Sequence, residues 1–193
     1  IPVVLFNRVV TEYDFSTVTV DDFGGAKRMV DYLIGTGKRR IAYIGGPNGI
    51  LLARERRKGY EVALEENGLQ FDPEIVKEGD FTLDAGRKLT TKLIEESPNI
   101  DCIFCVCDQV AYGAMQSLKS RNINIPSQIA VAGFTNESIS SLTSPPLTTM
   151  SQPMENIGKK VAQILIDHIN YYTVNYDPVH VKFDPEIIIR GSA

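Results

Sequence analysis

Residues 38–47 read KRRIAYIGGP, a short apolar run between a basic approach and a glycine-rich exit. The run 41–44 has no polar interruption, which is typical of a strand buried on both faces. Before it, apolar residues from Ala26 to Ile34 follow the i, i+3, i+4, i+7, i+8 spacing of one buried helix face. After it, a helix is expected over 52–67, ending on Gly68. A buried strand between two helices predicts a parallel sheet covered by helices on both faces.

The same alternation continues along nearly the whole chain. Further strands are expected at residues 3–6, 17–20, 75–77, 102–106, 129–132, 179–182 and 186–189. Further helices are expected at residues 83–96 and 153–171, and from an Asp108 cap to Leu118. The sequence therefore predicts an α/β fold with parallel sheets.

Ligands of such sheets bind outside the carboxyl ends of the strands. Here that rule selects residues 7–8, 21–24, 45–47, 107–109 and 133–136.

The composition limits the possible functions. The 193 residues are 43% hydrophobic, enough for a sizeable core, and carry a net charge of −4. A surface that binds DNA needs clustered lysine and arginine, so any DNA contact is expected in a part outside this chain. No run approaches the roughly 20 apolar residues of a membrane span. No secretory leader opens the given sequence, and three clustered cysteines do not suit a disulfide framework, so we expect a cytoplasmic protein.

Arg56 is the most informative single residue. In the helix expected over 52–67, Lys58 belongs to a charged outer face, whereas Arg56 shares the inward stripe with Tyr60 and Leu64. An inward arginine one turn into a helix that follows a strand end can bind vicinal hydroxyls or a carboxylate with its planar fork. An internal ion pair is the alternative.

Other motifs have plainer interpretations. Gly45-Gly46-Pro47 lacks the spacing of a dinucleotide fingerprint or a P-loop, which favours a tight turn over a phosphate site. Cys102 and Cys105 would point to opposite faces of a strand, which favours packing over metal binding. Cys107 differs because it lies at a carboxyl end. Phe81 either stacks on a sugar or base, or anchors its turn.

Catalysis finds little support. His168 is late in a helix and His180 is in an alternating strand, so both are expected to be surface or hydrogen-bonded residues. Asp21 and Asp22 could act as acid and base, but capping the adjacent helix is favoured. We expect no enzyme, and no catalytic residue, metal or cofactor.

Nine segments, in order along the chain, carry a resemblance to a known family. They are 2–8 (PVVLFNR), 20–26 (VDDFGGA), 38–47 (KRRIAYIGGP), 56–60 (RRKGY), 78–82 (EGDFT), 107–115 (CDQVAYGAM), 129–134 (IAVAGF), 146–153 (PLTTMSQP) and 189–192 (IRGS). In this order they resemble the effector-binding region of the lactose-repressor (LacI/GalR) family of bacterial transcription regulators.

The resemblance implies a two-lobed fold similar to periplasmic sugar-binding proteins, with the first lobe incomplete in this chain and a small effector held between the lobes. Residues 1–50 would be the remainder of the amino-terminal lobe and 51–147 the carboxyl-terminal lobe. Residues 148–193 would be the crossover, the return helix and the closing strands at the lobe boundary. The family's helix-turn-helix DNA-binding head would precede Ile1.

The family's effector contacts can be carried over by motif position. They are Gly24, Leu52, Arg56, Phe81, Cys107, Asp108, Thr135, Asn136 and Gln152. Sugar-binding members usually offer asparagine where Cys107 stands and aspartate where Thr135 stands. Each lost polar partner should cost about 1–3 kcal/mol of sugar affinity, although Asn136 could substitute if its loop shifts.

The expected function is therefore a non-enzymatic switch. A small effector, a sugar or sugar derivative, would favour one lobe orientation, and a homodimer would pass this to two DNA-binding heads on an operator. No membrane contact is expected. The alternative is a solute-binding protein of a sugar transporter, which shares the fold. A leader peptide or a helix-turn-helix head in the complete gene would separate the two.

Overall fold

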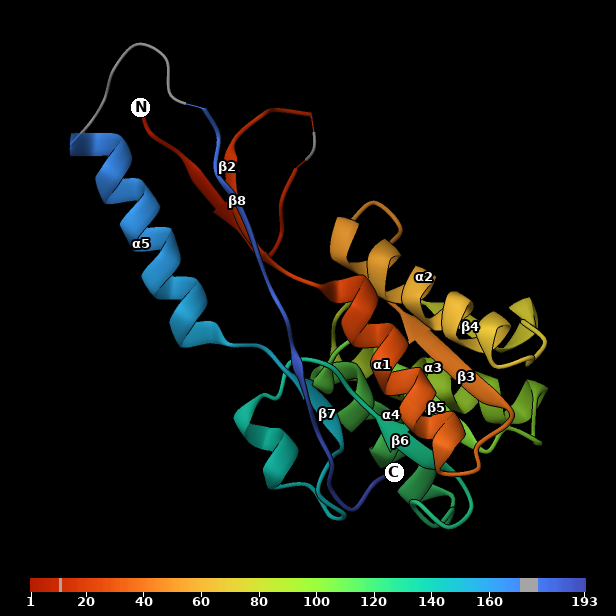
Figure 1. The fold of residues 1–193 in the computed structure, drawn as a ribbon. Coiled ribbons are helices and arrows are strands. Elements are labelled where there is room, and N and C mark those ends of the chain that lie inside the picture. Colours follow the sequence, from red (N-terminus) through yellow and green to blue (C-terminus); the bar gives the residue numbers. More distant parts are fainter. Residues whose placement is uncertain (11, 171–176) are drawn as a thin grey trace. The chain divides into compact units, whose positions relative to one another are not determined.

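A computed structural model describes residues 1–10, 12–170 and 177–193, which form two compact units (Figure 1). Unit 1 consists of Ile1–Asp21 and Gln152–Pro185, and unit 2 of Asp22–Ser151 and Glu186–Ala193. The chain therefore passes from one unit to the other three times. Each unit is described by itself.

The boundaries of the units differ from the predicted lobe boundaries at residues 50 and 147. Residues 22–50 belong to unit 2 together with the elements that follow them. Helix α1 (Asp22–Gly35) packs on α2 (Leu51–Glu66), and strand β3 (Ile41–Gly45) pairs with β5 (Cys102–Cys105). The boundary is thus set by pairing between distant segments, which local periodicity does not reveal.

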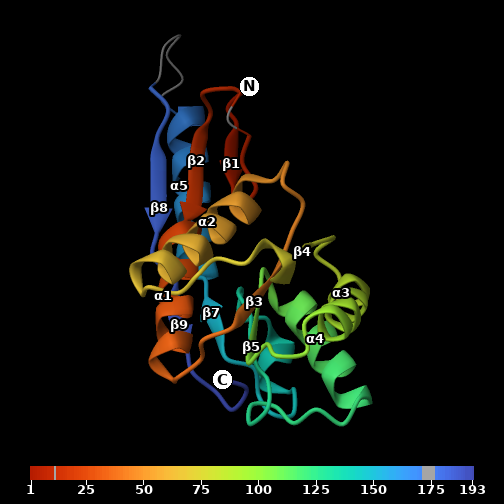
Figure 2. The ribbon, with the colours of Figure 1, turned by 90° about the vertical axis from the view of Figure 1, so that its right-hand side faces the viewer.

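Unit 2 contains a four-stranded parallel sheet in the order β4-β3-β5-β6, where β4 is Val76–Glu78 and β6 is Ala130–Ala132. Helices α1 and α2 cover one face, and α3 (Leu83–Glu96) and α4 (Asp108–Ser120) cover the other (Figures 1 and 2). Strands β3 and β5 are buried along their whole length. This confirms the predicted parallel sheet with helices on both faces.

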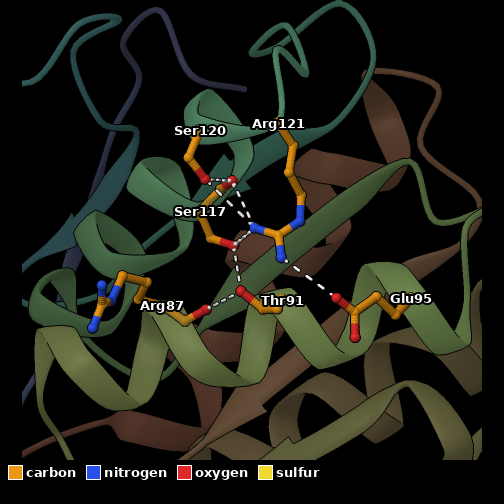
Figure 3. Close-up of polar contacts among 6 residues, drawn as sticks. All are labelled: Arg87, Thr91, Glu95, Ser117, Ser120 and Arg121. Atoms are coloured by element: carbon orange, nitrogen blue, oxygen red, sulfur yellow. Dashed lines mark hydrogen bonds and ion pairs between the residues drawn. The ribbon is translucent and has the colours of Figure 1, made fainter.

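Two glycines let α3 and α4 cross closely. A Cβ on Gly113 would collide with the Leu83 carbonyl oxygen, and one on Gly86 with the Val110 carbonyl oxygen. Further along the helices, hydroxyl and charged groups bridge the pair (Figure 3). These contacts are Thr91 Oγ1 to Ser117 Oγ at 3.0 Å and Arg121 Nη2 to Glu95 Oε1 at 3.5 Å.

Helices α1 and α2 end at the glycines that predicted their ends in the sequence. Gly37 has a φ of 95° and Gly68 a φ of 69°, the left-handed conformation that closes α1 and α2. At the start of α4, the cap prediction was wrong by one residue, because Cys107 is the N-cap and Asp108 the first helical residue. The Asp108 carboxylate bonds to other segments instead.

A two-stranded antiparallel sheet adjoins the end of β6 in unit 2. It pairs β7 (Thr149–Ser151) with β9 (Glu186–Ile188), and single bridges join Ala132 to Thr148 and Thr135 to Ser151. Strand β7 was not predicted, because it lies at the end of a Ser/Thr/Pro-rich stretch. Short 3-10 helices, η1 (Pro73–Ile75) and η2 (Ser138–Ser141), complete the unit.

Unit 1 contains a three-stranded parallel sheet and one helix. The sheet order is β1-β2-β8, and the helix is α5. The bounds are Val4–Phe6 for β1, Ser16–Val20 for β2, His180–Phe183 for β8 and Met154–Asn170 for α5. Val18, Val20, Ile157 and Ile164 form its core. The predicted helix end at Tyr171 lies outside the described residues. No helix in the described part of the chain has the length and apolar character to cross a membrane.

Candidate functional site

The carboxyl ends of β3, β4, β5 and β6 meet at one edge of unit 2, because the four strands are parallel. The chain adds β4 on one side of β3 and β5 on the other, so the strand order reverses between β3 and β5. Parallel α/β sheets bind ligands outside the carboxyl ends of their strands at such a reversal. The residues that follow these strands are therefore the candidate site.

Arg56 lies buried at this reversal, with 2% of its surface exposed. Its Nη1 donates to the Val106 carbonyl oxygen, just after β5, at 2.6 Å. Its Nε and Nη2 donate to Asp22 Oδ1 at 2.8 and 2.7 Å. Its Cζ lies 3.8 Å from the centroid of the Phe134 ring, just after β6. Arg56 thus ties α2 to the start of α1 and to two strand ends.

The internal ion pair that was the alternative interpretation of Arg56 is present in the structure. Asp22, the first residue of α1, is 7% exposed, so both charges are removed from water. The sequence favoured a capping role for Asp22 and did not connect it with Arg56. Because Asp22 compensates its charge, Arg56 can offer a ligand N–H donors in a fixed direction. Its contact with an effector stays a prediction.

Phe81 follows β4 and packs against the turn after β3. A Cβ on Gly46 would lie 2.6 Å from Cε1 and Cζ of Phe81, so the ring packs directly on this glycine. The turn closes with a hydrogen bond from Ile50 N to the Pro47 carbonyl at 3.0 Å. These contacts support the tight-turn interpretation of residues 45–47 and the anchoring interpretation of Phe81. Ligand stacking on Phe81 stays untested.

Two residues with raised pKa values follow β5. Cys107 is 7% exposed, and burial raises the pKa of its thiol, which is therefore a neutral, weak donor. Asp108 is fully buried, and burial raises the pKa of its carboxyl to about 6. Its Oδ1 accepts from Thr149 Oγ1 at 2.6 Å and its Oδ2 from Glu137 N at 2.8 Å. Asp108 thus positions the loop after β6.

The loop after β6 is strained and firmly held. Thr135 has a φ of 123° and Asn136 a φ of 52°, which are rare for residues other than glycine and cost about 1–3 kcal/mol each. Thr135 N donates to the Met150 carbonyl at 2.8 Å. Asn136 Oδ1 accepts from Arg190 Nη2 at 2.8 Å, and Asn136 Nδ2 donates to Ser151 Oγ at 3.3 Å. Both ends of the Asn136 amide are therefore engaged within the protein.

Glu137 is a residue of this edge that sequence reasoning missed. It is half-buried, and its Oε2 accepts from Gln109 Nε2 at 2.6 Å. Its Oε1 lies 3.5 Å from Thr135 Oγ1. The sequence did hold a signal for Glu137. It is a carboxylate that stands one position after residues 133–136, the group expected to lie at the carboxyl end of this strand.

The remaining predicted contacts are in different surroundings. Gly24 is half-buried in the first turn of α1, and Leu52, 6% exposed, packs in the core of unit 2. Gln152 belongs to unit 1 and is 8% exposed, and its Nε2 has no hydrogen-bond partner among the described residues. Whether an effector touches any of the three is untested.

The other two cysteines and the two histidines do not add side chains to this edge among the described residues. Cys102 and Cys105 are fully buried free thiols whose pKa values are raised by burial, which confirms the packing interpretation. Both histidines belong to unit 1, where His180 Nδ1 lies 3.0 Å from Thr17 Oγ1 and His168 is buried. The described residues contain no cluster of three side chains suited to a metal ion.

Comparisons with known proteins identify the family. The model of the periplasmic binding protein-like domain matches residues 30–193. The HTH-type transcriptional repressor CytR of Escherichia coli (strain K12) is 34% identical over 191 residues, which are 99% of this chain and 55% of CytR. A solved complex of the transcriptional regulator CelR with cellobiose superposes with a TM-score of 0.93 at 32% identity, over 98% of this chain and 58% of that one. A LacI-family regulatory protein from Chloroflexus aggregans gives a TM-score of 0.89 at 30% identity, over 99% of this chain and 68% of that one.

The chain spans about half the length of the curated relatives it matches, which are transcriptional regulators and not enzymes. Matches over nearly the whole chain, together with the parallel sheets, confirm the predicted resemblance and fold class. The chain therefore belongs to the LacI family of transcriptional regulators, and its residues 30–193 match the periplasmic binding protein-like domain.

Proposed function

We propose that this chain is the effector-sensing part of a bacterial transcriptional repressor, and that its effector is a small polar molecule, a sugar or sugar derivative. The observation that carries the proposal is Arg56, a buried arginine fixed at the strand-order reversal of a parallel sheet. The cellobiose complex of the similar regulator CelR supports a carbohydrate-like effector.

The proposed mechanism is a two-state switch. The effector binds at the carboxyl edge of the unit 2 sheet and shifts the regulator toward one of two conformations, which it must bind with unequal affinity. In the full-length protein, a homodimer carries two helix-turn-helix heads, and the conformations differ in how these heads fit the operator half-sites. The protein acts in the cytoplasm.

The test uses the full-length regulator and a fluorescent operator fragment. Anisotropy titrations with and without cellobiose, related disaccharides and nucleosides measure operator affinity. We expect an effector to change this affinity in the wild type and in the control variant Arg54→Ala, whose side chain is exposed on the same helix. Arg56→Ala and Arg56→Lys should still bind the operator but respond less to the effector.

Two results would count against this proposal in different ways. If Arg56→Ala, with an unchanged circular dichroism spectrum, responds like the wild type, Arg56 does not belong to the site. If no small molecule changes operator affinity, the chain is not the sensing part of a repressor.

A solute-binding protein of a transporter is the second candidate, because the matching family model describes periplasmic binding protein-like domains. The curated relatives favour the regulator. The complete gene separates the two, since a leader peptide favours transport and a helix-turn-helix head favours regulation.

A further inference from the structure

We propose that the Glu137 carboxylate binds the effector directly, and that the effector is a neutral or positively charged molecule that presents hydroxyl or amine donors. Phosphorylated sugars and sugar acids are excluded by this inference. It rests on the proposed function and adds a binding residue and a ligand class to it.

The Glu137 carboxylate has unused capacity to accept hydrogen bonds. An ionised carboxylate offers about four acceptor positions. Gln109 Nε2 occupies one at 2.6 Å, whereas the Thr135 hydroxyl is a weak partner at 3.5 Å. Neither partner carries a charge, although the side chain is half-buried. Ligand hydroxyls or an ammonium group would supply the missing donors.

The position of Glu137 is fixed before any ligand binds. Its own N–H is held by the buried Asp108 carboxylate at 2.8 Å. The preceding residues, Thr135 and Asn136, keep strained backbone angles and are tied to β7 and Arg190. Strained residues that the surrounding structure over-determines are concentrated at ligand sites. A rigid loop also reduces the entropy lost on binding.

The arginines that reach this edge are already neutralised or bonded. Arg56 is paired with Asp22, and Arg57 with Glu61 and Glu78. Arg190 donates to Asn136 Oδ1, Ser140 Oγ and the Leu147 carbonyl oxygen. An anionic ligand that replaced Asp22 at Arg56 would leave a buried carboxylate without its cation. It would also face the Glu137 charge. A neutral or cationic donor meets neither obstacle.

The experiment is a calorimetric screen of the full-length regulator. The neutral and cationic set is cellobiose, ribose, adenosine, cytidine and glucosamine, and the anionic set is glucose 6-phosphate, ribose 5-phosphate and gluconate. The isosteric variant Glu137→Gln removes the charge at the site. The control Glu95→Gln removes a carboxylate from α3, where the contact of Glu95 within the described part of the chain is a long one to Arg121 (Figure 3).

We expect at least one neutral or cationic compound to bind the wild type and Glu95→Gln alike, and to bind Glu137→Gln about tenfold to a hundredfold more weakly. Three results would overturn the inference. They are equal binding to Glu137→Gln, preferred binding of an anionic compound, and no binding by any neutral or cationic compound. In the first two cases, a ligand that still changes operator affinity in the full-length regulator leaves the proposed function intact.

Discussion

The buried pair of Asp22 and Arg56 gives the sharpest expectation for a single residue. Replacing Asp22 by alanine leaves the Arg56 charge buried without its partner, and such a loss typically lowers the free energy of unfolding by about 3–5 kcal/mol. The matched control is Asp84→Ala, which removes an exposed carboxylate paired with Arg87 and Lys88 and should lower the free energy of unfolding much less. Urea unfolding followed by circular dichroism measures both variants. Equal losses would mean that the buried pair contributes no more than a surface one.

Asp108 should make stability depend on pH in an unusual direction. Its folded-state pKa of about 6 lies above the ordinary value of 3.8, so the folded protein holds this proton more tightly than the unfolded chain does. Its contribution to the unfolding free energy is therefore fully present below about pH 4 and is lost as the pH rises through 6. The loss amounts to about 3 kcal/mol.

The variant Asp108→Asn isolates the contribution of this carboxyl to the pH dependence, because an asparagine side chain does not titrate. The unfolding free energy of the wild type minus that of Asp108→Asn should fall as the pH is raised from 4 to 7. The contributions of most other titratable groups are the same in both proteins and cancel in this difference. Urea unfolding at four pH values in this range measures the difference. A difference that stays constant would place the Asp108 pKa near its ordinary value.

Sequence reasoning reached some site residues and not others for a physical reason. Arg56 was found because helical spacing places it on an inward stripe. Its partner Asp22 was assigned to capping, because contacts between residues 34 positions apart leave no periodic signal. Glu137 was missed because Thr135 and Asn136 have positive φ angles. The alternation of side chains along the strand therefore does not predict where the Glu137 side chain points.

At the scale of elements, the crossing of α3 and α4 depends on its two glycines. In an exposed helix, replacing glycine by alanine gains up to about 1 kcal/mol. At Gly113 the added methyl would meet the Leu83 backbone, which cannot rotate away, so Gly113→Ala should instead lower the free energy of unfolding by about 1–3 kcal/mol. The control is Gly158→Ala in α5, where a Cβ would have no neighbour within 4 Å and should stabilise. Thermal unfolding distinguishes them, and stabilisation by Gly113→Ala would contradict the close crossing.

The elements themselves were predictable because amphipathic spacing and glycine stops are local. The helix at 83–96 has the predicted bounds, and the expected strands are present with ends shifted by a residue or so. The exception is β7, since its pairing with β9 joins residues more than 30 positions apart. The same reason explains the unit boundary. Residues 22–50 belong to unit 2 because β3 pairs with β5, although in the sequence they directly follow the first segment of unit 1.

At the scale of the whole molecule, unit 2 is completed by the last residues of the chain. After passing through unit 1, residues 186–193 return to pair with β7 and to close the edge of β6. Ser192 is fully buried, and its Oγ donates to the Val131 carbonyl at 2.6 Å and accepts from Thr148 N at 2.8 Å. The fold of unit 2 therefore depends on a segment that the intervening unit separates from it in the chain.

This dependence predicts that Ser192→Ala destabilises unit 2. The change leaves the Val131 carbonyl and the Thr148 N–H buried without a partner, which costs about 1–3 kcal/mol for each group. Ser141→Ala, which removes an exposed hydroxyl bonded to the Ser138 carbonyl, should cost less than about 0.5 kcal/mol. Hydrogen exchange adds a local readout, because protection of the Thr148 amide should drop in Ser192→Ala, while amides of β2 in unit 1 keep theirs. Equal loss of protection in both units would show instead that the chain unfolds as one cooperative body, with the closing segment stabilising both units together.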